Sequence, residues 1–254
     1  LNGWITTTPS GFNWIYEKFV KSPTENFFMI HSKTSENPYL PPEYLATLKQ
    51  EYTGVFAKQE IEGEFVGFEG VVYPEFSRNV HVINTEYKAD DFYVIAGVDW
   101  GFTNPSVILV VAIDSDERFH ILEEFYQSHI MTEDLIKQAK MLQDRYNIKA
   151  FYCDPSEPQF IKQFNMAGLF AVEAKNEIMP GIKAVAAKLQ VKGDSKPALY
   201  VNENCVNVIM EFENYRYPEK QEGKPTQENP LKVFDHSMDS LRYAVMGHKG
   251  VIGW

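Results

Sequence analysis

The feature that most constrains the fold is a regular succession of apolar segments that begins at about Tyr87. Residues 92–101 read FYVIAGVDWG, residues 105–114 read PSVILVVAID, and residues 119–127 read FHILEEFYQ after the polar turn SDER. Short apolar runs bounded by turn residues predict β-strands. Because the connections are also short, we expect three neighbouring antiparallel strands.

The residues that follow alternate between helical and strand patterns. A helix is predicted at 132–147, with Thr132 as its N-cap and Leu135, Ala139 and Leu142 on one face. Further strands are predicted at 148–155, 169–174 and 197–202, and further helices at 157–168, 179–191 and 205–217. Right-handed crossovers then give a mixed α/β sheet flanked by helices, in which the fourth strand lies parallel beside the first.

The residues before this region are irregular. Residues 3–9, GWITTTP, suggest a short strand, and residues 11–20 have a helical pattern. Pro41 and Pro42 stand where a helix would begin. Residues 59–76 resemble short strands interrupted by glycines. This block is incomplete as an independent domain.

Two aspartates follow directly on predicted strands. Asp99 ends the first strand and Asp154 ends the fourth. If these strands are parallel neighbours, both carboxylates lie at the same edge of the sheet, although they are far apart in sequence. Carboxylates held this close repel one another unless a cation neutralises them. Mg²⁺ and Mn²⁺ prefer oxygen ligands, so the pattern predicts a divalent metal site.

A third acidic cluster opens the last predicted helix, in residues 234–244, FDHSMDSLRYA. Asp235, His236 and Asp239 share one face, because residues three and four apart are neighbours on a helix. Asp239 lies at the boundary of the apolar stripe that must pack on the sheet. A third carboxylate there would complete a two-metal site, in which the ions lie roughly 3.5–4 Å apart.

Each of these residues also has a purely structural interpretation. Asp99 could bind nearby backbone amides in a strand-end turn, and Asp154 precedes a proline that favours a turn. Asp235 is well placed as an N-cap, and His236 could be an ordinary surface imidazole. The combination is more specific than any single residue.

Three stretches taken together resemble the nuclease motifs of phage terminase large subunits: GVDWGFTNPS (97–106), YCDPSEP (152–158) and DHSMDSLRYA (235–244). Residues 4–19, WITTTPSGFNWIYEKF, resemble the end of the terminase ATPase domain. The resemblance implies a ribonuclease H-like nuclease domain over residues 87–254. Residues 1–86 would be the end of the ATPase domain and a linker.

The resemblance also implies a role for each site residue. Asp99, Asp154 and Asp239 match the acidic triad that binds two Mg²⁺ or Mn²⁺ ions, and His236 matches a histidine that accompanies the last aspartate. The implied activity is cleavage of double-stranded viral DNA during genome packaging, in the host cell cytoplasm, with the portal protein and the small terminase subunit as partners. Residues 212–234 fall where the family often carries a β-hairpin, so we expect the preceding helix to end by about Tyr215.

The sequence contains no glycine-rich phosphate loop of the form G-x-x-x-x-G-K-[ST]. The chain therefore cannot be the packaging motor by itself. We expect it to be the nuclease portion of a longer polypeptide, with a remnant of the ATPase domain.

Charge and cysteine content bound the alternatives. The formal net charge of −11 argues against a broad basic DNA-binding face, but Lys175 and Lys183 lie in a locally basic stretch that could contact phosphates. A solvated helix face explains those lysines equally well. Cys153 and Cys205 have neither metal-ligand spacing nor a disulfide framework, so we expect a reducing, intracellular setting. No apolar run approaches the ~18 residues that span a bilayer, so we expect no membrane partner.

Other classes of protein share parts of this pattern. A junction resolvase or a transposase-type nuclease would have the carboxylates but not the Thr-Thr-Pro segment. An actin-like ATPase would account for the DWG sequence at Asp99, but it would leave Asp239 without a role. A non-enzymatic packaging or assembly module would use the acidic residues only as caps.

Overall fold

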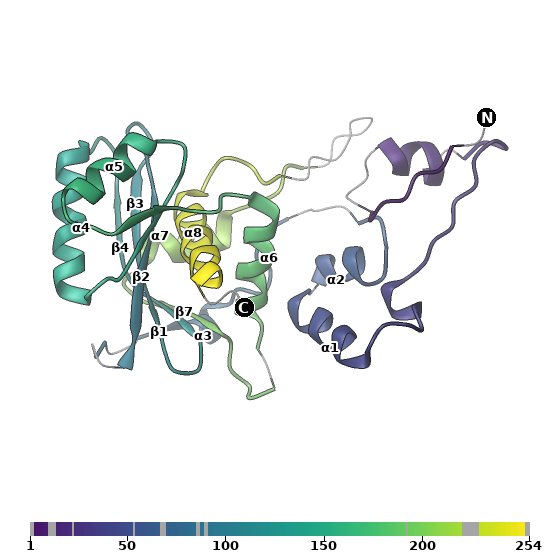
Figure 1. Cartoon of the computed structure of the whole chain (residues 1–254), viewed down its shortest axis with the longest axis horizontal. Helices are drawn as coiled ribbons and strands as arrows, with labels where there is room; N and C mark the ends of the chain where they lie inside the picture. Colours follow the sequence, from purple (N-terminus) through teal and green to yellow (C-terminus); the bar gives the residue numbers. More distant parts are fainter. Residues whose placement is uncertain are drawn as a thin grey trace. The chain divides into compact units, whose positions relative to one another are not determined.

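A computed structural model of the chain describes residues 3–9, 14–21, 23–52, 54–66, 70–84, 87–88, 91–191, 193–219 and 229–251. The chain divides into two compact units, each of which is described by itself (Figure 1). One unit comprises Leu1–Val72 and Arg216–Leu231, and the other comprises Tyr73–Tyr215 and Lys232–Trp254. The chain therefore leaves the second unit after Tyr215 and returns to it at Lys232.

The first unit contains short helices in its described residues. They are a π-helix η1 (Tyr16–Lys21), a 3₁₀-helix η2 (Thr34–Glu36), α1 (Pro42–Glu51) and α2 (Gly54–Glu60). As predicted, α1 begins at Pro42, with Pro41 at the N-cap position. Of the helical pattern predicted at 11–20, residues 14–20 are helical, and residues 11–13 lie outside the described part.

Two strand predictions in this unit are wrong. Residues 3–9 have no regular secondary structure. Helix α2 runs through Glu60, and the described residues between 61 and 76 contain no more than one isolated bridge, from Val71 to Arg216. Residues 67–69 of this prediction lie outside the described part. A strand is stabilised mainly by its cross-strand neighbours. An apolar segment without a paired partner therefore need not become a strand, whatever its composition.

The second unit is built on a seven-stranded mixed sheet with the order β1-β7-β4-β3-β2-β5-β6. The predicted antiparallel meander is β2-β3-β4, and β5 lies parallel beside β2, as predicted. The strands are β1 (Val82–Ile83), β2 (Tyr93–Asp99), β3 (Ser106–Ile113), β4 (Phe119–Gln127), β5 (Phe151–Cys153), β6 (Ala171–Glu173) and β7 (Leu199–Asn202). The predicted fold class is confirmed, although the two-residue strand β1 was not predicted.

Helices cover both faces of this sheet (Figure 1). One face carries α4 and α5, and the other carries α8 with α6 and α7 beside it. Strand β3 is buried along its whole length, as expected for a central strand covered on both sides. The helices are α3 (Arg78–His81), α4 (Thr132–Tyr146), α5 (Pro158–Met166), α6 (Ile178–Leu189), α7 (Val206–Asn214) and α8 (His236–Val251).

Helix α4 starts one residue earlier than the predicted cap implied. Thr132 is its first helical residue, and the N-cap position belongs to Met131, which makes no capping hydrogen bond through its side chain. The prediction of Thr132 as the N-cap is therefore wrong. Leu135, Ala139 and Leu142 are buried together, as predicted. The apolar periodicity correctly predicted which face of α4 is buried, but it did not predict the residue at which the helix begins.

Helix α8 lies in backbone contact with β2. A Cβ atom added at Gly97 would lie 1.9 Å from the carbonyl oxygen of Ser240. No side chain fits between the strand and the helix at this point. Gly97 is two residues before Asp99, so the contact fixes the helix against the carboxyl end of β2.

The connection between α7 and α8 is described only in part. Helix α7 ends at Asn214, which agrees with the expected end by about Tyr215. Of residues 212–234, where the family resemblance places a β-hairpin, 220–228 lie outside the described residues. Cys153 and Cys205 are both free and buried. Among the described residues, no helix is long and apolar enough to cross a membrane.

Candidate functional site

The two strand-end aspartates meet at the same edge of the sheet. Asp99 is the last residue of β2, and Asp154 directly follows β5, whose Cys153 pairs with Val98. The amide of Asp154 donates to the carbonyl of Val98 at 2.9 Å, and the indole Nε1 of Trp100 donates to the carbonyl of Asp154 at 2.8 Å. Parallel pairing thus places these residues together by backbone register alone.

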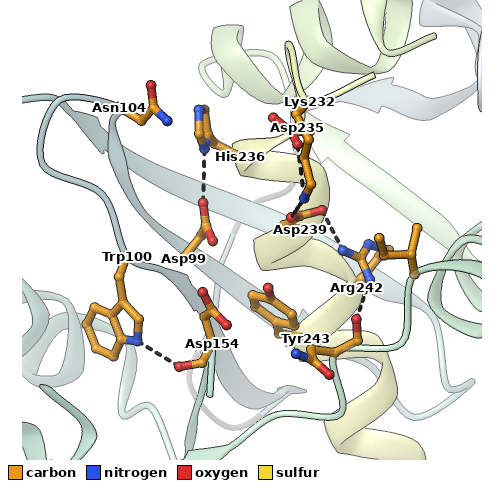
Figure 2. A pocket seen from close by; sticks show the side chains of 12 residues that line it. Asp99, Trp100, Asn104, Asp154, Lys232, Asp235, His236, Asp239, Arg242 and Tyr243 are labelled. Atoms are coloured by element: carbon orange, nitrogen blue, oxygen red, sulfur yellow. Dashed lines mark hydrogen bonds and ion pairs between the residues drawn. The ribbon is translucent and has the colours of Figure 1, made fainter. Parts of the chain in front are cut away.

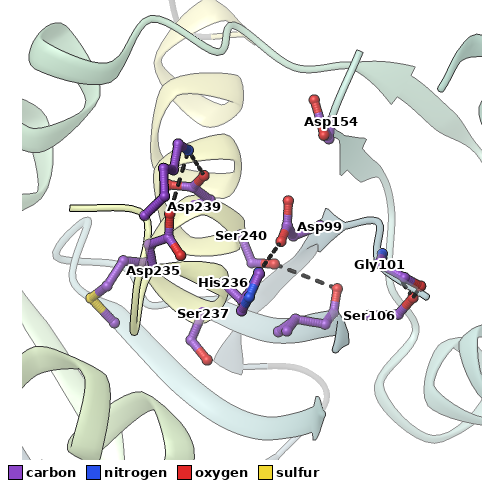
Figure 3. Close-up of polar contacts among 12 residues, drawn as sticks. Asp99, Gly101, Ser106, Asp154, Asp235, His236, Ser237, Asp239 and Ser240 are labelled. Carbon is purple, nitrogen blue, oxygen red and sulfur yellow. Dashed lines mark hydrogen bonds and ion pairs between the residues drawn. The ribbon is translucent and has the colours of Figure 1, made fainter. Parts of the chain in front are cut away.

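The first turn of α8 brings the third predicted group to this edge (Figure 3). His236 begins the helix, and its Nδ1 lies 3.0 Å from Oδ2 of Asp99. Asp239 follows one turn later, and its amide donates to the carbonyl of Asp235 at 2.7 Å. Asp239 is buried, with 6% of its surface exposed. The helix therefore presents His236 and Asp239 beside a carboxylate of the sheet.

A polar pocket of about 330 Å³ opens between these groups (Figure 2). All four predicted site residues line it, together with Asp235 and two basic side chains. The lining residues are Asp99, Trp100, Asn104, Asp154, Asn176, Ile178, Lys232, Asp235, His236, Asp239, Arg242 and Tyr243. Its composition suits a charged, hydrated ligand better than an apolar one.

The structural interpretations considered for the single residues hold only in part. Asp154 does form a turn, because its carboxylate accepts hydrogen bonds from the amide and the hydroxyl of Ser156 at 3.0 and 2.6 Å. The carboxylate of Asp99 is instead bonded to His236. The side chain of Asp235 pairs with Lys232, at 3.4 Å. These contacts leave the three carboxylates of the predicted triad facing one pocket.

Asp239 is paired with two cations that sequence reasoning did not find (Figure 2). Arg242 donates from Nη2 to Oδ1 of Asp239 at 2.5 Å, and Nζ of Lys232 lies 3.3 Å from Oδ2. Arg242 is almost fully buried and also donates to the carbonyls of Asn176 and Glu177, at 3.5 and 3.3 Å. A helical i, i+3 spacing of Asp and Arg was the available signal for this pair.

The electrostatics of Asp99 reflect a crowded, buried acidic site. Burial raises the pKa of Asp99, and the neighbouring carboxylates of Asp239 and Asp154 add to this shift, while His236 opposes it. The resulting pKa is about 7. The same hydrogen bond to Asp99 raises the pKa of His236. A group whose charged form is this costly gains most when a cation lies beside it.

A buried glutamate supports the start of α8 and was also missed. Glu211 of α7 accepts hydrogen bonds from the amides of Ser237 and Met238 at 2.6 and 3.3 Å, and from the hydroxyl of Tyr126 at 2.9 Å. It is fully buried, and burial raises its pKa to about 7. The sequence signal was an acidic residue on the apolar stripe of the predicted helix 205–217.

The donor set fits a hard divalent cation. The pocket offers the carboxylate oxygens of Asp99, Asp154 and Asp239, which are the ligands that Mg²⁺ and Mn²⁺ prefer. In the conformation described, no three aspartate, glutamate, histidine or cysteine side chains of the described residues lie close enough together to hold an ion. Asp239 is turned toward Lys232 and Arg242, which account for both of its oxygens.

The two predicted DNA-contacting lysines do not line the pocket. Lys175 is exposed just before α6, and Lys183 is half-buried within α6. Both lie near Asn176 and Ile178 in sequence, which do line the pocket. Their contact with DNA stays a prediction.

The sheet order and the site together define the class of this domain. Three antiparallel strands followed by parallel strands, with acidic residues at the ends of β2 and β5 and on the last helix, form a ribonuclease H-like arrangement. Residues 96–247 match the model of the family described as Terminase RNaseH-like domain, and the chain belongs to this family. The resemblance inferred from the three sequence motifs is thereby confirmed.

Two large terminases resemble this chain over most of its length. The large subunit of the terminase of Escherichia phage T5 is 24% identical over 94% of this chain and 56% of its own length. The large terminase of a thermophilic bacteriophage superposes with a TM-score of 0.77 at 24% identity, covering 96% of this chain and 61% of that one. The chain thus spans about three-fifths of the length of these relatives.

One similar solved structure contains a bound metal. The nuclease domain of the large terminase of bacteriophage SPP1, with bound Mn, has a TM-score of 0.52 at 17% identity. The match covers 69% of this chain and 97% of that domain. At this level of identity the likeness shows the shared fold.

Proposed function

We propose that this chain carries a metal-dependent endonuclease that cuts double-stranded viral DNA during genome packaging. The observation that carries the proposal is that Asp99, Asp154 and Asp239, which come from three separate parts of the fold, line one open, polar pocket. Membership of the terminase ribonuclease H-like family and the Mn bound to the SPP1 relative support it.

In this proposal, some site residues bind metal ions and others orient these ligands. Asp99, Asp154 and Asp239 would hold two Mg²⁺ or Mn²⁺ ions. When bound, such ions activate a water molecule for attack on phosphorus and stabilise the leaving oxygen. His236 orients the Asp99 carboxylate through the 3.0 Å contact at its Nδ1, and Arg242 orients Asp239 from the buried side.

Double-stranded DNA would be recognised through its backbone. Lys175 and Lys183 would contact phosphates, which contribute affinity without reading sequence. Replacing both with Ala is expected to weaken DNA binding and to reduce its salt dependence, measured by fluorescence anisotropy at several ionic strengths. Unchanged affinity and an unchanged salt slope would remove these lysines from the interface.

The setting of the reaction rests on the longer relatives. We propose that residues 1–86 are the end of an ATPase domain and a linker, and that residues 87–254 are the nuclease domain. The full protein would work in the host cell cytoplasm with the portal protein and the small terminase subunit. These assignments follow the terminases that the chain resembles.

Plasmid cleavage tests the proposal directly. The chain is expected to nick and linearise supercoiled plasmid in Mg²⁺ or Mn²⁺ but not in EDTA, and Asp154→Ala should abolish cleavage. Asp144→Ala is a matched control, because Asp144 is an exposed acidic residue on α4. Cleavage that survives Asp154→Ala would refute the site, and an intact plasmid would favour a non-enzymatic module. A strong preference for branched DNA would favour a junction resolvase or transposase-type enzyme.

A further inference from the structure

Lys232 lies where a cation would bind to the acidic residues around the start of α8. Its Nζ lies 3.3 Å from Oδ2 of Asp239 and 3.4 Å from Oδ2 of Asp235. These two carboxylates are four residues apart and nearly buried, with 9% and 4% of their side chains exposed. Two carboxylates at this spacing repel one another, so the ammonium group of Lys232 stabilises them by its contact with both.

The two cations of Asp239 differ in how firmly they are held. Arg242 is 1% exposed, and its aliphatic part lies against Gly181, where an added Cβ atom would be 2.9 Å from the Arg242 Cδ. Its guanidinium also bonds the two backbone carbonyls that precede α6. Lys232 precedes α8, and 68% of its side chain is exposed. Arg242 is therefore a fixed partner, whereas Lys232 can leave without disturbing the core.

A divalent ion at Asp239 would have to approach the carboxylate from the open pocket, since Arg242 covers the buried side. Arg242 occupies Oδ1 of Asp239, and the other oxygen, Oδ2, is the one that Lys232 contacts. An ammonium group and a divalent ion at the same oxygen repel one another strongly in a partly buried site. The two cations therefore compete for one position.

We propose that Lys232 is an exchangeable counter-cation of the Asp235–Asp239 pair, which a divalent metal ion displaces when it binds. This inference rests on the metal site of the proposed function. It gives Lys232 a role that depends on the state of the site: it neutralises the carboxylates in the metal-free protein, and it is released toward the open pocket in the metal-bound protein. It also makes Asp235 part of the cation-binding region, beyond its place before α8.

Metal affinity measured without any substrate tests the exchange. The Kd for Mn²⁺, from calorimetry or from the electron paramagnetic resonance of free Mn²⁺, is expected to fall on the order of ten-fold in Lys232→Met. Lys232→Arg should keep the wild-type Kd, because it retains the competing charge. Lys140→Met removes the same charge from an exposed position on α4 and should leave the Kd unchanged.

The outcomes separate this inference from the proposed function. An unchanged or weaker Mn²⁺ affinity in Lys232→Met would overturn the exchange, as would an equal gain in Lys140→Met. If the wild-type protein binds no Mn²⁺, or binds it equally well after Asp99→Asn, the metal site itself fails and the exchange fails with it. Circular dichroism of each variant establishes that the fold is retained.

Discussion

The carboxylates at the strand ends and those around the start of α8 are positioned in different ways. Asp99 and Asp154 are placed by parallel pairing of β2 with β5, which is a backbone interaction. Asp235 and Asp239 are placed by side chains: Glu211 binds the start of α8, and Arg242 and Lys232 bind the carboxylates. Half of the site therefore follows from sheet topology, and the other half depends on a network that individual substitutions can break.

This difference implies different sensitivities to mutation. Side-chain substitutions should hardly change the positions of Asp99 and Asp154. Substitutions on or around α8 should instead displace Asp235 and Asp239 and destabilise the second unit. The two halves meet at Gly97, where strand and helix are in backbone contact. The largest effect is expected there.

Gly97→Val should destabilise the second unit most. A Cβ atom alone would lie 1.9 Å from the Ser240 carbonyl, so α8 must move away from β2. We expect a loss of about 5 kcal/mol or more in unfolding free energy, measured by urea denaturation. Gly193→Ala is the control, because an added Cβ atom there meets nothing within 4 Å. Near-wild-type stability of Gly97→Val would show that the strand and the helix are not in the contact described.

Arg242→Met should follow closely. It leaves the Asp239 carboxylate buried without its fixed partner, which typically costs about 3–5 kcal/mol. Arg78→Met is the comparison, because the Arg78–Glu213 ion pair is exposed and screened by solvent, and it should be far milder. Equal losses in the two variants would show that burial does not increase the contribution of the Asp239–Arg242 pair to the unfolding free energy.

Glu211→Ala should cost an intermediate amount. It removes the acceptor for the amide of Ser237 and the hydroxyl of Tyr126, and buried donors left unsatisfied cost about 1–3 kcal/mol. Thermal unfolding monitored by circular dichroism measures the loss. A variant as stable as the wild type would show that solvent or another residue satisfies these donors.

Glu211 should also contribute to the pH dependence of stability. Its folded pKa of about 7 lies above the unfolded value of about 4.3, so its contribution is complete below the unfolded value. The contribution is lost as the pH rises through about 7. Glu211→Gln should therefore flatten the decline in unfolding free energy between acidic and neutral pH. An identical pH profile in the variant would show that Glu211 does not titrate in this range.

Trp100→Phe should have the smallest effect. It removes the hydrogen bond from the indole to the Asp154 carbonyl but keeps an aromatic ring against Phe160 and Phe164. The expected loss is about 1 kcal/mol, because the pairing of β5 with β2 remains. If plasmid cleavage fell as far as in Asp154→Ala, backbone register alone would not be enough to position Asp154.

The sequence predicted that Asp99 and Asp154 lie at the same edge of the sheet, for a physical reason. Alternation of apolar strands and amphipathic helices restricts topology severely, and parallel neighbours carry their carboxyl ends to one edge. Asp99 and Asp154 could therefore be brought together from the order of the elements. The same reasoning failed at 3–9 and 59–76, where nothing in the sequence specifies a partner strand.

The helix half was predicted only in outline. Helical spacing grouped His236 with Asp239, but it could not show which cations neutralise Asp239. Lys232 reaches the carboxylates from a turn before the helix, and Arg242 is fixed by carbonyls that precede α6. Contacts of this kind depend on packing between elements that are distant in sequence.

The close approach at Gly97 has a consequence for heating experiments. At Gly97 the strand and the helix touch through peptide groups and not through long side chains. Side-chain rotamer changes therefore cannot loosen this contact gradually as the temperature rises. The carboxylates should keep their arrangement until the whole unit melts in one cooperative transition. Mn²⁺ affinity measured during slow warming should therefore stay nearly level and then collapse at the melting temperature of the second unit.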